Sequence, residues 1–237
     1  MAPKARMATV EDSRFLAEMM YESTLAGVGR GLFDPALAGS GVAPIDFNEA
    51  LLLAGASNWG QIEDFFVLEA AAGPLAGAAS AYLSDRSDRR PLTAEGFEAV
   101  VDRLGWPRDR AQAFWRSYVR LFGLFGDAPA LAQPARYVIE YVAVPASFRG
   151  RGYAQILLDA HLRRARALGH GEVAVSAMLG NEPALRAYRR CGFREHDRLG
   201  PERFAGAFPG MVRLVRDLSL CSAAETDAAL HSTSRPG

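Results

Sequence analysis

The segment of residues 141–171, YVAVPASFRGRGYAQILLDAHLRRARALGHG, constrains the fold of this chain more than any other. It begins as an apolar strand, passes through a loop that contains Gly150 and Gly152, and continues as a long amphipathic helix pattern. The start of a helix presents unpaired backbone N–H groups, and glycines before it let an anion approach the main chain closely. We therefore expect a strand–loop–helix unit that holds phosphate, with Arg149 and Arg151 as additional charged donors.

Two other phosphate-binding motifs do not fit this loop. No Gly-Lys-Ser or Gly-Lys-Thr sequence follows the first glycine, so the loop is not a P-loop. The third glycine of the dinucleotide-binding fingerprint is missing, and the preceding strand comes late in the chain. Taken alone, the loop also allows a tight strand-to-helix turn whose arginines are solvated.

The rest of the chain predicts further strands and helices, which makes this an α+β protein. Thr9 and Asp12 resemble a capping box that opens a helix, and residues 27–46, rich in Gly, Pro and Ala, read as a loop with at most one helical turn. Helices are also expected at 47–55, 151–168 and 182–190. Strands are expected at 4–9, 64–71, 74–83, 137–144, 172–178, 193–198 and 211–217.

Residues 84–134 predict a helical insert between the third and fourth strands. Thr93 is placed to cap one helix, and Pro107 precedes another. The aromatic residues of these helices repeat on one face, which is typical of packing against a core. We expect one domain over residues 1–221, which includes this insert, and a disordered tail over residues 222–237.

Composition excludes several classes of function. The chain has 237 residues, and 27 Lys and Arg balance 27 Asp and Glu, so no global charge favours nucleic acid or an anionic membrane. Cys191 and Cys221 lack the spacing of metal ligands and are too few for a disulfide framework. No apolar run reaches the length of a membrane span. We therefore expect a cytoplasmic protein without a metal, a nucleic-acid partner or a membrane anchor.

Two motifs together resemble the GNAT superfamily of acyl-CoA N-acyltransferases. FRGRGYAQILL matches the family pattern Arg/Gln-x-x-Gly-x-Gly/Ala at Arg149, Gly152 and Ala154. Downstream, NEPALRAYRRCGF resembles the second cofactor segment of the family. Its matching positions are Asn181, Ala184, Tyr188, Gly192 and Phe193. The resemblance is close over residues 137–198, whereas the insert at 84–134 departs from the minimal family pattern.

The resemblance implies a fold and a cofactor. The fold is a mixed, three-layer arrangement in which a β-sheet splayed at its centre is flanked by helices and binds acetyl-CoA in the cleft. The pyrophosphate would lie on the backbone amides of the loop, and the pantetheine arm would lie along the strand before it. Asn181 would serve as a helix cap, a pantetheine contact, or both. The implied contacts are Val142, Ala143, Val144, Arg149, Gly150, Arg151, Gly152, Tyr153, Ala154, Asn181 and Tyr188.

The family chemistry is direct attack of a neutral amine on the acetyl carbonyl, which requires two proton transfers. By resemblance, Tyr188 protonates the departing thiolate. For the base we favour Glu140, which interrupts an apolar strand and shares a face with Val138, Val142 and Val144 if the strand alternates regularly. The alternative is that Glu140 points to solvent or pairs with an arginine. His161 and His170 lie well inside the helix and at its far end, and are less apt.

Three functions agree with these residues. The first is acetyl transfer from acetyl-CoA to a primary amine on a small molecule or peptide. The second is transfer of a longer acyl group, and the third is a non-catalytic acyl-CoA-binding module. The acceptor and the choice between monomer and homodimer stay open. The insert's arginines suit an anionic acceptor or, as we expect, a solvated helix face; these are Arg103, Arg108, Arg110, Arg116 and Arg120.

Overall fold

A computed structural model describes residues 2–25, 28–71, 73–85, 88–123, 132–204 and 206–219. The expected disordered tail, 222–237, lies outside these residues. Within the described residues, seven strands form one sheet in the order β1-β2-β3-β4-β5-β7-β6, and among these pairings only that of β4 with β5 is parallel. The strands are β1 (Lys4–Met7), β2 (Phe66–Glu69), β3 (Leu75–Leu83), β4 (Tyr137–Ala143), β5 (Glu172–Met178), β6 (Arg194–Leu199) and β7 (Met211–Asp217).

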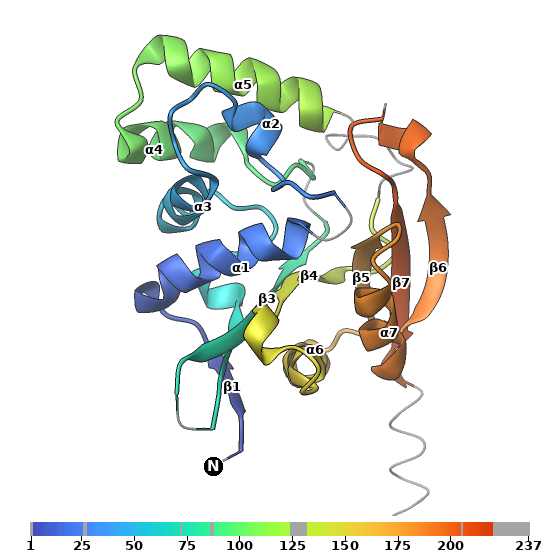
Figure 1. The fold of residues 1–237 in the computed structure, drawn as a ribbon. Helices are drawn as coiled ribbons and strands as arrows, with labels where there is room; N and C mark the ends of the chain where they lie inside the picture. Colours follow the sequence, from blue (N-terminus) through green and yellow to red (C-terminus); the bar gives the residue numbers. More distant parts are fainter. Residues whose placement is uncertain are drawn as a thin grey trace, which may run out of the picture.

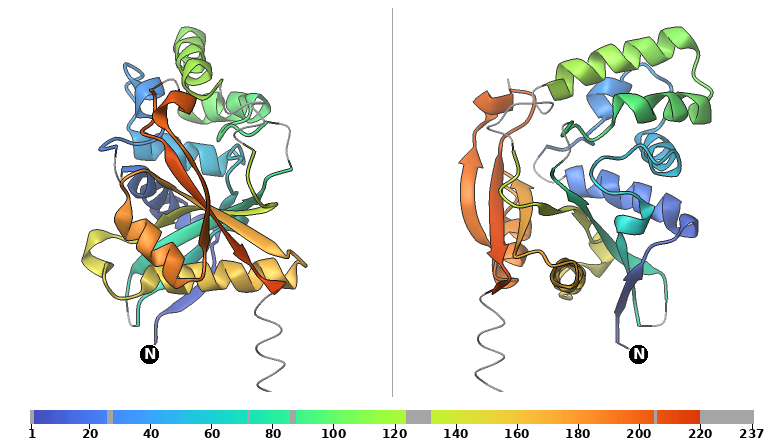
Figure 2. Two further views of the ribbon diagram at one scale, coloured as in Figure 1. Left: turned by 90° about the vertical axis from the view of Figure 1, so that its right-hand side faces the viewer. Right: turned by 180° about the vertical axis from the view of Figure 1, so that it is seen from behind.

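The sheet opens at its centre, between β4 and β5. Their parallel pairing covers Tyr137–Ile139 opposite Val173–Val175, and within the described sheet no pairing between them continues beyond it. On its other side β4 stays paired with β3, out to Ala143 opposite Ala78. Figure 1 shows β5, β7 and β6 turned away from β3 and β4, and Figure 2 shows the same divergence from two further sides. The splayed mixed sheet expected from the sequence is therefore present.

A bulge in β4 accompanies the opening. The register with β3 shifts between Ala78 and Ser80, and Tyr141 adopts a left-handed conformation with φ of 50°. Such a conformation is strained for a side chain of this size. The expected alternation is therefore wrong beyond Glu140: Val142 and Val144 pack with Ile139 on the opposite face from Val138.

Helices cover both faces of the sheet. On one face α6 (Tyr153–Ala167) packs against β1–β4, and α7 (Glu182–Arg190) packs against β5. On the other face α1 (Ser13–Leu25) crosses β3 and β4, and α3 (Pro44–Leu53) lies on α1. The three-layer arrangement agrees with the expected fold class.

The insert between β3 and β4 consists of α4 (Ala94–Leu104) and α5 (Arg108–Phe122), as predicted. Its helices pack on α3 and on the short α2 (Asp34–Leu37), beyond the layer that covers the sheet (Figure 1). Phe114, Tyr118 and Phe122 are buried in the core, which confirms that the aromatic stripe serves packing. The five arginines named above are all exposed, as a solvated face requires.

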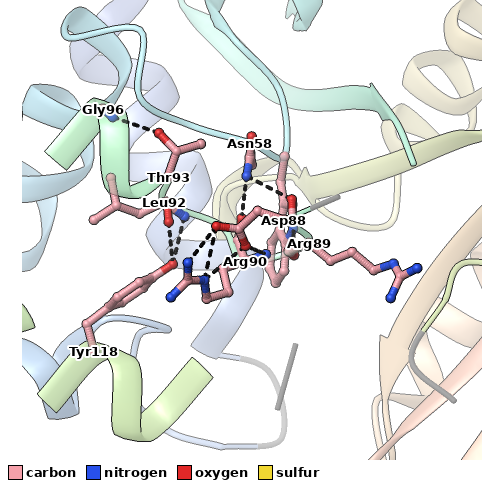
Figure 3. A network of polar contacts seen from close by, with 9 residues as sticks. Asn58, Asp88, Arg89, Arg90, Leu92, Thr93, Gly96 and Tyr118 are labelled. Carbon is pink, nitrogen blue, oxygen red and sulfur yellow. Dashed lines mark hydrogen bonds and ion pairs between the residues drawn. The ribbon is translucent and has the colours of Figure 1, made fainter. Parts of the chain in front are cut away.

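A polar network fastens the start of the insert to the loop before β2 (Figure 3). Asn58 donates to the carbonyl oxygens of Asp88 and Arg90 at 3.1 and 2.9 Å. The buried hydroxyl of Tyr118 donates to the carbonyl of Leu92 at 2.8 Å and accepts from its N–H at 2.9 Å. These bonds satisfy buried backbone groups that packing alone would leave unpaired.

Most boundaries lie within three residues of their expected positions. The helix predicted at 47–55 begins earlier, at Pro44, because proline is favoured in the first turn of a helix. It ends at Leu53, and Gly55 follows in a left-handed conformation that closes the helix end. Residues 27–46, expected as a loop with at most one turn, contain one turn of helix, α2, before α3 begins.

Candidate active site

Two cavities meet where β4 and β5 separate. We call the first the cofactor cavity, which has about 440 Å³ and lies between the glycine loop and α7. The second, the acceptor cavity, has about 100 Å³ and lies on the side of α1 and the β6–β7 connection. Both cavities are lined by Ser23, Val142, Asn181, Ala184 and Tyr188. Two ligands bound in the two cavities would therefore meet beside Tyr188.

The glycine loop joins β4 to α6, as the sequence predicts. Gly150 and Gly152 both have φ of 77°, a region that side chains with a Cβ rarely adopt. A Cβ on Gly150 would meet no atom within 4 Å, and one on Gly152 would meet only Gln155 Oε1 at 3.6 Å. The space over both glycines is thus open, and both line the cofactor cavity beside Tyr153 and Ala154. Backbone N–H groups at the start of α6 are available to an anion there.

The two arginines of the loop have separate positions. Arg149 lines the cofactor cavity, donates to the carbonyl of Val144 at 3.0 Å, and forms an ion pair with Glu22 of α1. Arg151 is exposed, lies over the ring of Phe148 at 5.6 Å, and donates to the carbonyl of Ser147 at 3.3 Å. Contact of either arginine with phosphate stays a prediction.

Helix α7 supplies the opposite wall of the cofactor cavity. Asn181 caps the helix, since its side chain accepts a hydrogen bond from the N–H of Ala184 at 3.3 Å. Arg186 and Arg190 also line this cavity, one helical turn apart. The sequence interpretation missed both arginines, although their i, i+4 spacing after the Asn181 cap was a usable signal.

Strand β4 supplies the inner wall of the cofactor cavity. Val142, Ala143 and Val144 all line it, and their contact with a cofactor stays a prediction. Beyond Ile139, the described sheet offers no β5 partner for the edge of β4 that faces the opening. Main-chain groups of this edge are therefore available to an extended ligand arm, in the manner of an added strand.

Glu140 lies at the junction, on the acceptor side. It is half-buried, lines the acceptor cavity, and stands opposite Ser80 of β3. Burial raises the pKa of Glu140 to about 7, against a smaller opposing effect of the Tyr141 backbone N–H. A carboxylate with this pKa is suited to accept a proton near neutral pH. Among the described residues that line this cavity, it is the only one with a formal charge.

Tyr188 is buried on α7 and lines both cavities. Burial and, to a smaller extent, the nearby charge of Glu140 raise the pKa of Tyr188 well above its ordinary value. The phenol therefore stays protonated at neutral pH and can donate a hydrogen bond to an anion that develops beside it.

The histidines near the sheet serve its structure. His161 is fully buried between the hydroxyl of Tyr137 and the carbonyl of Ala79, with both nitrogens at 2.9 Å. Its Nε2 must donate to the carbonyl, so Nδ1 accepts from the tyrosine. Burial lowers the pKa of His161 to about 4, which keeps the ring neutral. Neither His161 nor His170 lines the two cavities.

The described residues contain no group of three or more His, Cys, Asp or Glu side chains placed to hold a metal ion. None of their helices combines the length and apolar character needed to cross a bilayer.

The acceptor cavity contains most of the residues that the sequence interpretation missed. Its lining comes from many segments of the chain, and examples are Leu32, Trp59, Gln133, Tyr141, Ser176, Met178, Phe208 and Met211. No contiguous motif joins these positions. Only the folded sheet, the insert and the β6–β7 connection bring them together.

Comparison with known proteins agrees with this geometry. The family model described as the Acetyltransferase (GNAT) family matches residues 107–193, which run from α5 to the end of α7. No protein of curated function gives a match.

Solved structures share the fold over nearly their whole length. SsHAT is 21% identical, with a TM-score of 0.60 over 92% of this chain and 98% of that one. An N-acetyltransferase from Staphylococcus aureus Mu50 is 18% identical, with a TM-score of 0.55 over 90% and 100%. YncA, a putative acetyltransferase from Salmonella typhimurium solved with acetyl-CoA, is 15% identical, with a TM-score of 0.51 over 92% and 95%. The chain therefore has the fold of these acetyltransferases, and its residues 107–193 match the family model of the GNAT acetyltransferases.

Proposed function

We propose that this protein is an N-acetyltransferase that moves the acetyl group of acetyl-CoA to a primary amine in a ternary complex. The observation that carries the proposal is the meeting of the two cavities at Tyr188, with Glu140 on the acceptor side. A donor and an acceptor bound in these cavities would be held next to each other. Such proximity is worth as much as about 7–11 kcal/mol of the barrier in well-oriented systems.

The residues of the cofactor cavity fit acetyl-CoA. The open space over Gly150 and Gly152 suits a pyrophosphate on the backbone amides at the start of α6. Arg186 and Arg190 add positive charge on the opposite wall. The unpaired edge of β4 suits the amide groups of a pantetheine arm. A thioester that arrives along this edge would reach the junction of the cavities.

Glu140 and Tyr188 divide the two proton transfers. Glu140 accepts the proton of the bound ammonium, which frees the nitrogen lone pair. As the new C–N bond forms, the C–S bond breaks and its electron pair stays on sulfur. Tyr188 donates a hydrogen bond, and finally its proton, to that sulfur. The nitrogen then releases its second surplus proton, which re-forms the phenol of Tyr188 through solvent, while Glu140 returns its proton to solvent. Because attack is direct, no covalent acetyl-enzyme forms.

A screen for release of free CoA tests the proposal. The purified protein is incubated with acetyl-CoA and a panel of amines, amino acids, polyamines and peptides, and thiol is measured. We expect thiol release that depends on one class of amine and that falls by about 10²–10⁴-fold in Tyr188→Phe. Acetyl-CoA that binds but releases no thiol with any amine would support a binding module instead. A parallel series of longer acyl-CoA donors tests the choice of acyl group.

A further inference from the structure

The described lining of the acceptor cavity carries a single negative charge and no positive charge. Glu140 is the only formally charged residue among its described lining residues. One ammonium group would be neutralised by this carboxylate. A second charge of either sign on the same ligand would lose its water without gaining a partner on these walls, which is unfavourable.

Three buried polar atoms at the lining residues have no hydrogen-bond partner in the described structure. They are the hydroxyl of Tyr141, the hydroxyl of Ser176 and Oε1 of Gln133. Buried polar atoms in folded proteins are nearly always paired. Such atoms also occur elsewhere in the described residues, for example at Ser57 and Trp106, but three of them belong to residues that line this one cavity, which favours a ligand group as their partner. Gln133 Oε1 can only accept a hydrogen bond, whereas the two hydroxyls can donate or accept. The complementary ligand group is a hydroxyl or a similar uncharged donor and acceptor.

The remaining wall is apolar and rich in aromatic and sulfur-containing side chains. Its main members are Leu32, Trp59, Ile139, Met178, Phe208 and Met211. The ring of Trp59 lies 6.2 Å from that of Tyr141 and 6.5 Å from that of Tyr82. A flat apolar ligand body would bury its surface against these rings.

The insert holds this wall in position. Trp59 donates from Nε1 to the carbonyl of Arg89 at 2.9 Å, within the segment that Figure 3 shows tied to Asn58. Its own carbonyl accepts from Ser80 at 2.8 Å, opposite Glu140 on the neighbouring strand. At the other end of the insert, Phe122 packs on Phe208 at 5.8 Å. The insert thus fixes two aromatic walls of the cavity.

We propose that the acceptor is a compact primary monoamine with an aromatic or other flat apolar body, a hydroxyl-type group and no further charge. This inference rests on the proposed function, because it places the reacting amine at Glu140. The carboxylate binds the ammonium, the aromatic wall takes the body, and the three unpaired polar atoms take the hydroxyl. Polyamines and free amino acids are poor ligands, because each brings a second charge into a cavity that holds one carboxylate.

The test measures binding and turnover separately. Tyramine, 2-phenylethylamine, putrescine and tyrosine are titrated calorimetrically into CoA-loaded protein, and each is then assayed with acetyl-CoA. We expect kcat/KM for tyramine to exceed that for putrescine and for tyrosine by about 100-fold or more. If none is acetylated but tyramine alone binds, the acceptor class stands and the proposed reaction fails. If tyramine does not bind, or if putrescine, tyrosine or a peptide is preferred, the acceptor class is overturned.

Two variants address the polar atoms directly. Ser176→Ala should reduce the preference for tyramine over 2-phenylethylamine by about 2–10-fold, as expected for one neutral hydrogen bond. Gln133→Glu preserves shape and adds a second carboxylate, so it should raise the ratio of putrescine to tyramine turnover. Gln112→Glu makes the same change on the exposed face of α5 and serves as the control. If both glutamate variants shift the ratio equally, or if Ser176→Ala leaves the tyramine preference intact, these atoms do not contact the acceptor.

Discussion

The two cavities that meet at Tyr188 are built in different ways. The cofactor cavity takes nearly all of its lining from residues 142–155 and 181–190, together with Glu22 and Ser23 of α1. The acceptor cavity collects residues from Ser23 to Met211. A common donor can be held by backbone groups at glycines and a helix start, which a short motif encodes. A particular acceptor needs side chains that only the tertiary structure assembles.

Binding of acetyl-CoA in the cofactor cavity can be abolished by a substitution at one glycine of the loop. Gly152→Val forces a β-branched residue into a left-handed conformation and fills the open space over the loop. We expect acetyl-CoA to lose its stabilising effect on the protein in a thermal-shift assay. Gly169→Val is the matched control, because Gly169 has φ of 78° and lies at the far end of α6. Both variants should lose roughly 1–3 kcal/mol of stability, but only the control should still respond to acetyl-CoA.

The proposed proton donor at the meeting point of the two cavities can be removed without loss of binding in either cavity. Tyr188→Phe keeps the buried ring and removes only the hydroxyl, so acetyl-CoA should bind with the parent affinity. We expect kcat to fall by about 10²–10⁴-fold, which is typical for loss of a general acid. Pre-steady-state measurement of CoA release separates this effect from slow product release. Parent-like turnover would mean that the thiolate takes its proton from solvent.

Glu140→Gln tests the base through the pH dependence of the rate. In the parent, kcat/KM should rise as pH increases through about 7, because only ionised Glu140 accepts a proton. The variant should lack this inflection and should approach the parent only where free amine becomes abundant. A solvent-exposed glutamate, with its ordinary pKa, would place the inflection in kcat/KM at lower pH. The pH of the inflection therefore reports how far burial raises the pKa of Glu140. Parallel profiles would remove Glu140 from the mechanism.

The same substitution should stabilise the protein at alkaline pH. The pKa of Glu140 is raised in the folded state, so the unfolded chain releases this proton first, between pH of about 4 and 7. The parent therefore loses stability as pH rises through this window, whereas the Glu140→Gln variant, which has no carboxyl to titrate, does not. The free energy of unfolding of Glu140→Gln, measured relative to that of the parent, should therefore be about 1–3 kcal/mol higher at pH 8 than at pH 4. Urea unfolding at the two pH values measures the difference.

Substitutions on the outer face of the insert are expected to have the smallest effect on the KM values. Arg116 and Arg110 are exposed on α5 and do not line the acceptor cavity. Arg116→Ala should leave the KM of both substrates unchanged within about twofold, because surface substitutions away from a site have little effect. A selective rise in the acceptor KM would show that the arginine face contacts the acceptor and would contradict the role given to the aromatic wall.

Sequence patterns were informative where function depends on local chain geometry. The positions of Gly150, Gly152 and Asn181 follow from turn and cap chemistry within a few residues, and the structure has them as expected. The face of Val142 and Val144 was predicted wrongly, because the bulge at Tyr141 depends on pairing with β3. No local sequence pattern marked Trp59, Gln133 or Ser176 as site residues. Their common feature is spatial, since each borders the opening of the sheet.

Direct attack in a ternary complex is the central claim, and the fate of a labelled acetyl group tests it most directly. The protein is mixed with one equivalent of acetyl-CoA carrying a heavy acetyl group, first alone and then with tyramine. Intact-protein and small-molecule mass spectra are recorded over a single turnover. The account predicts that the label passes to the amine nitrogen as CoA is released, while the protein stays unlabelled throughout. An acetylated protein that forms without amine and then transfers its label would contradict it.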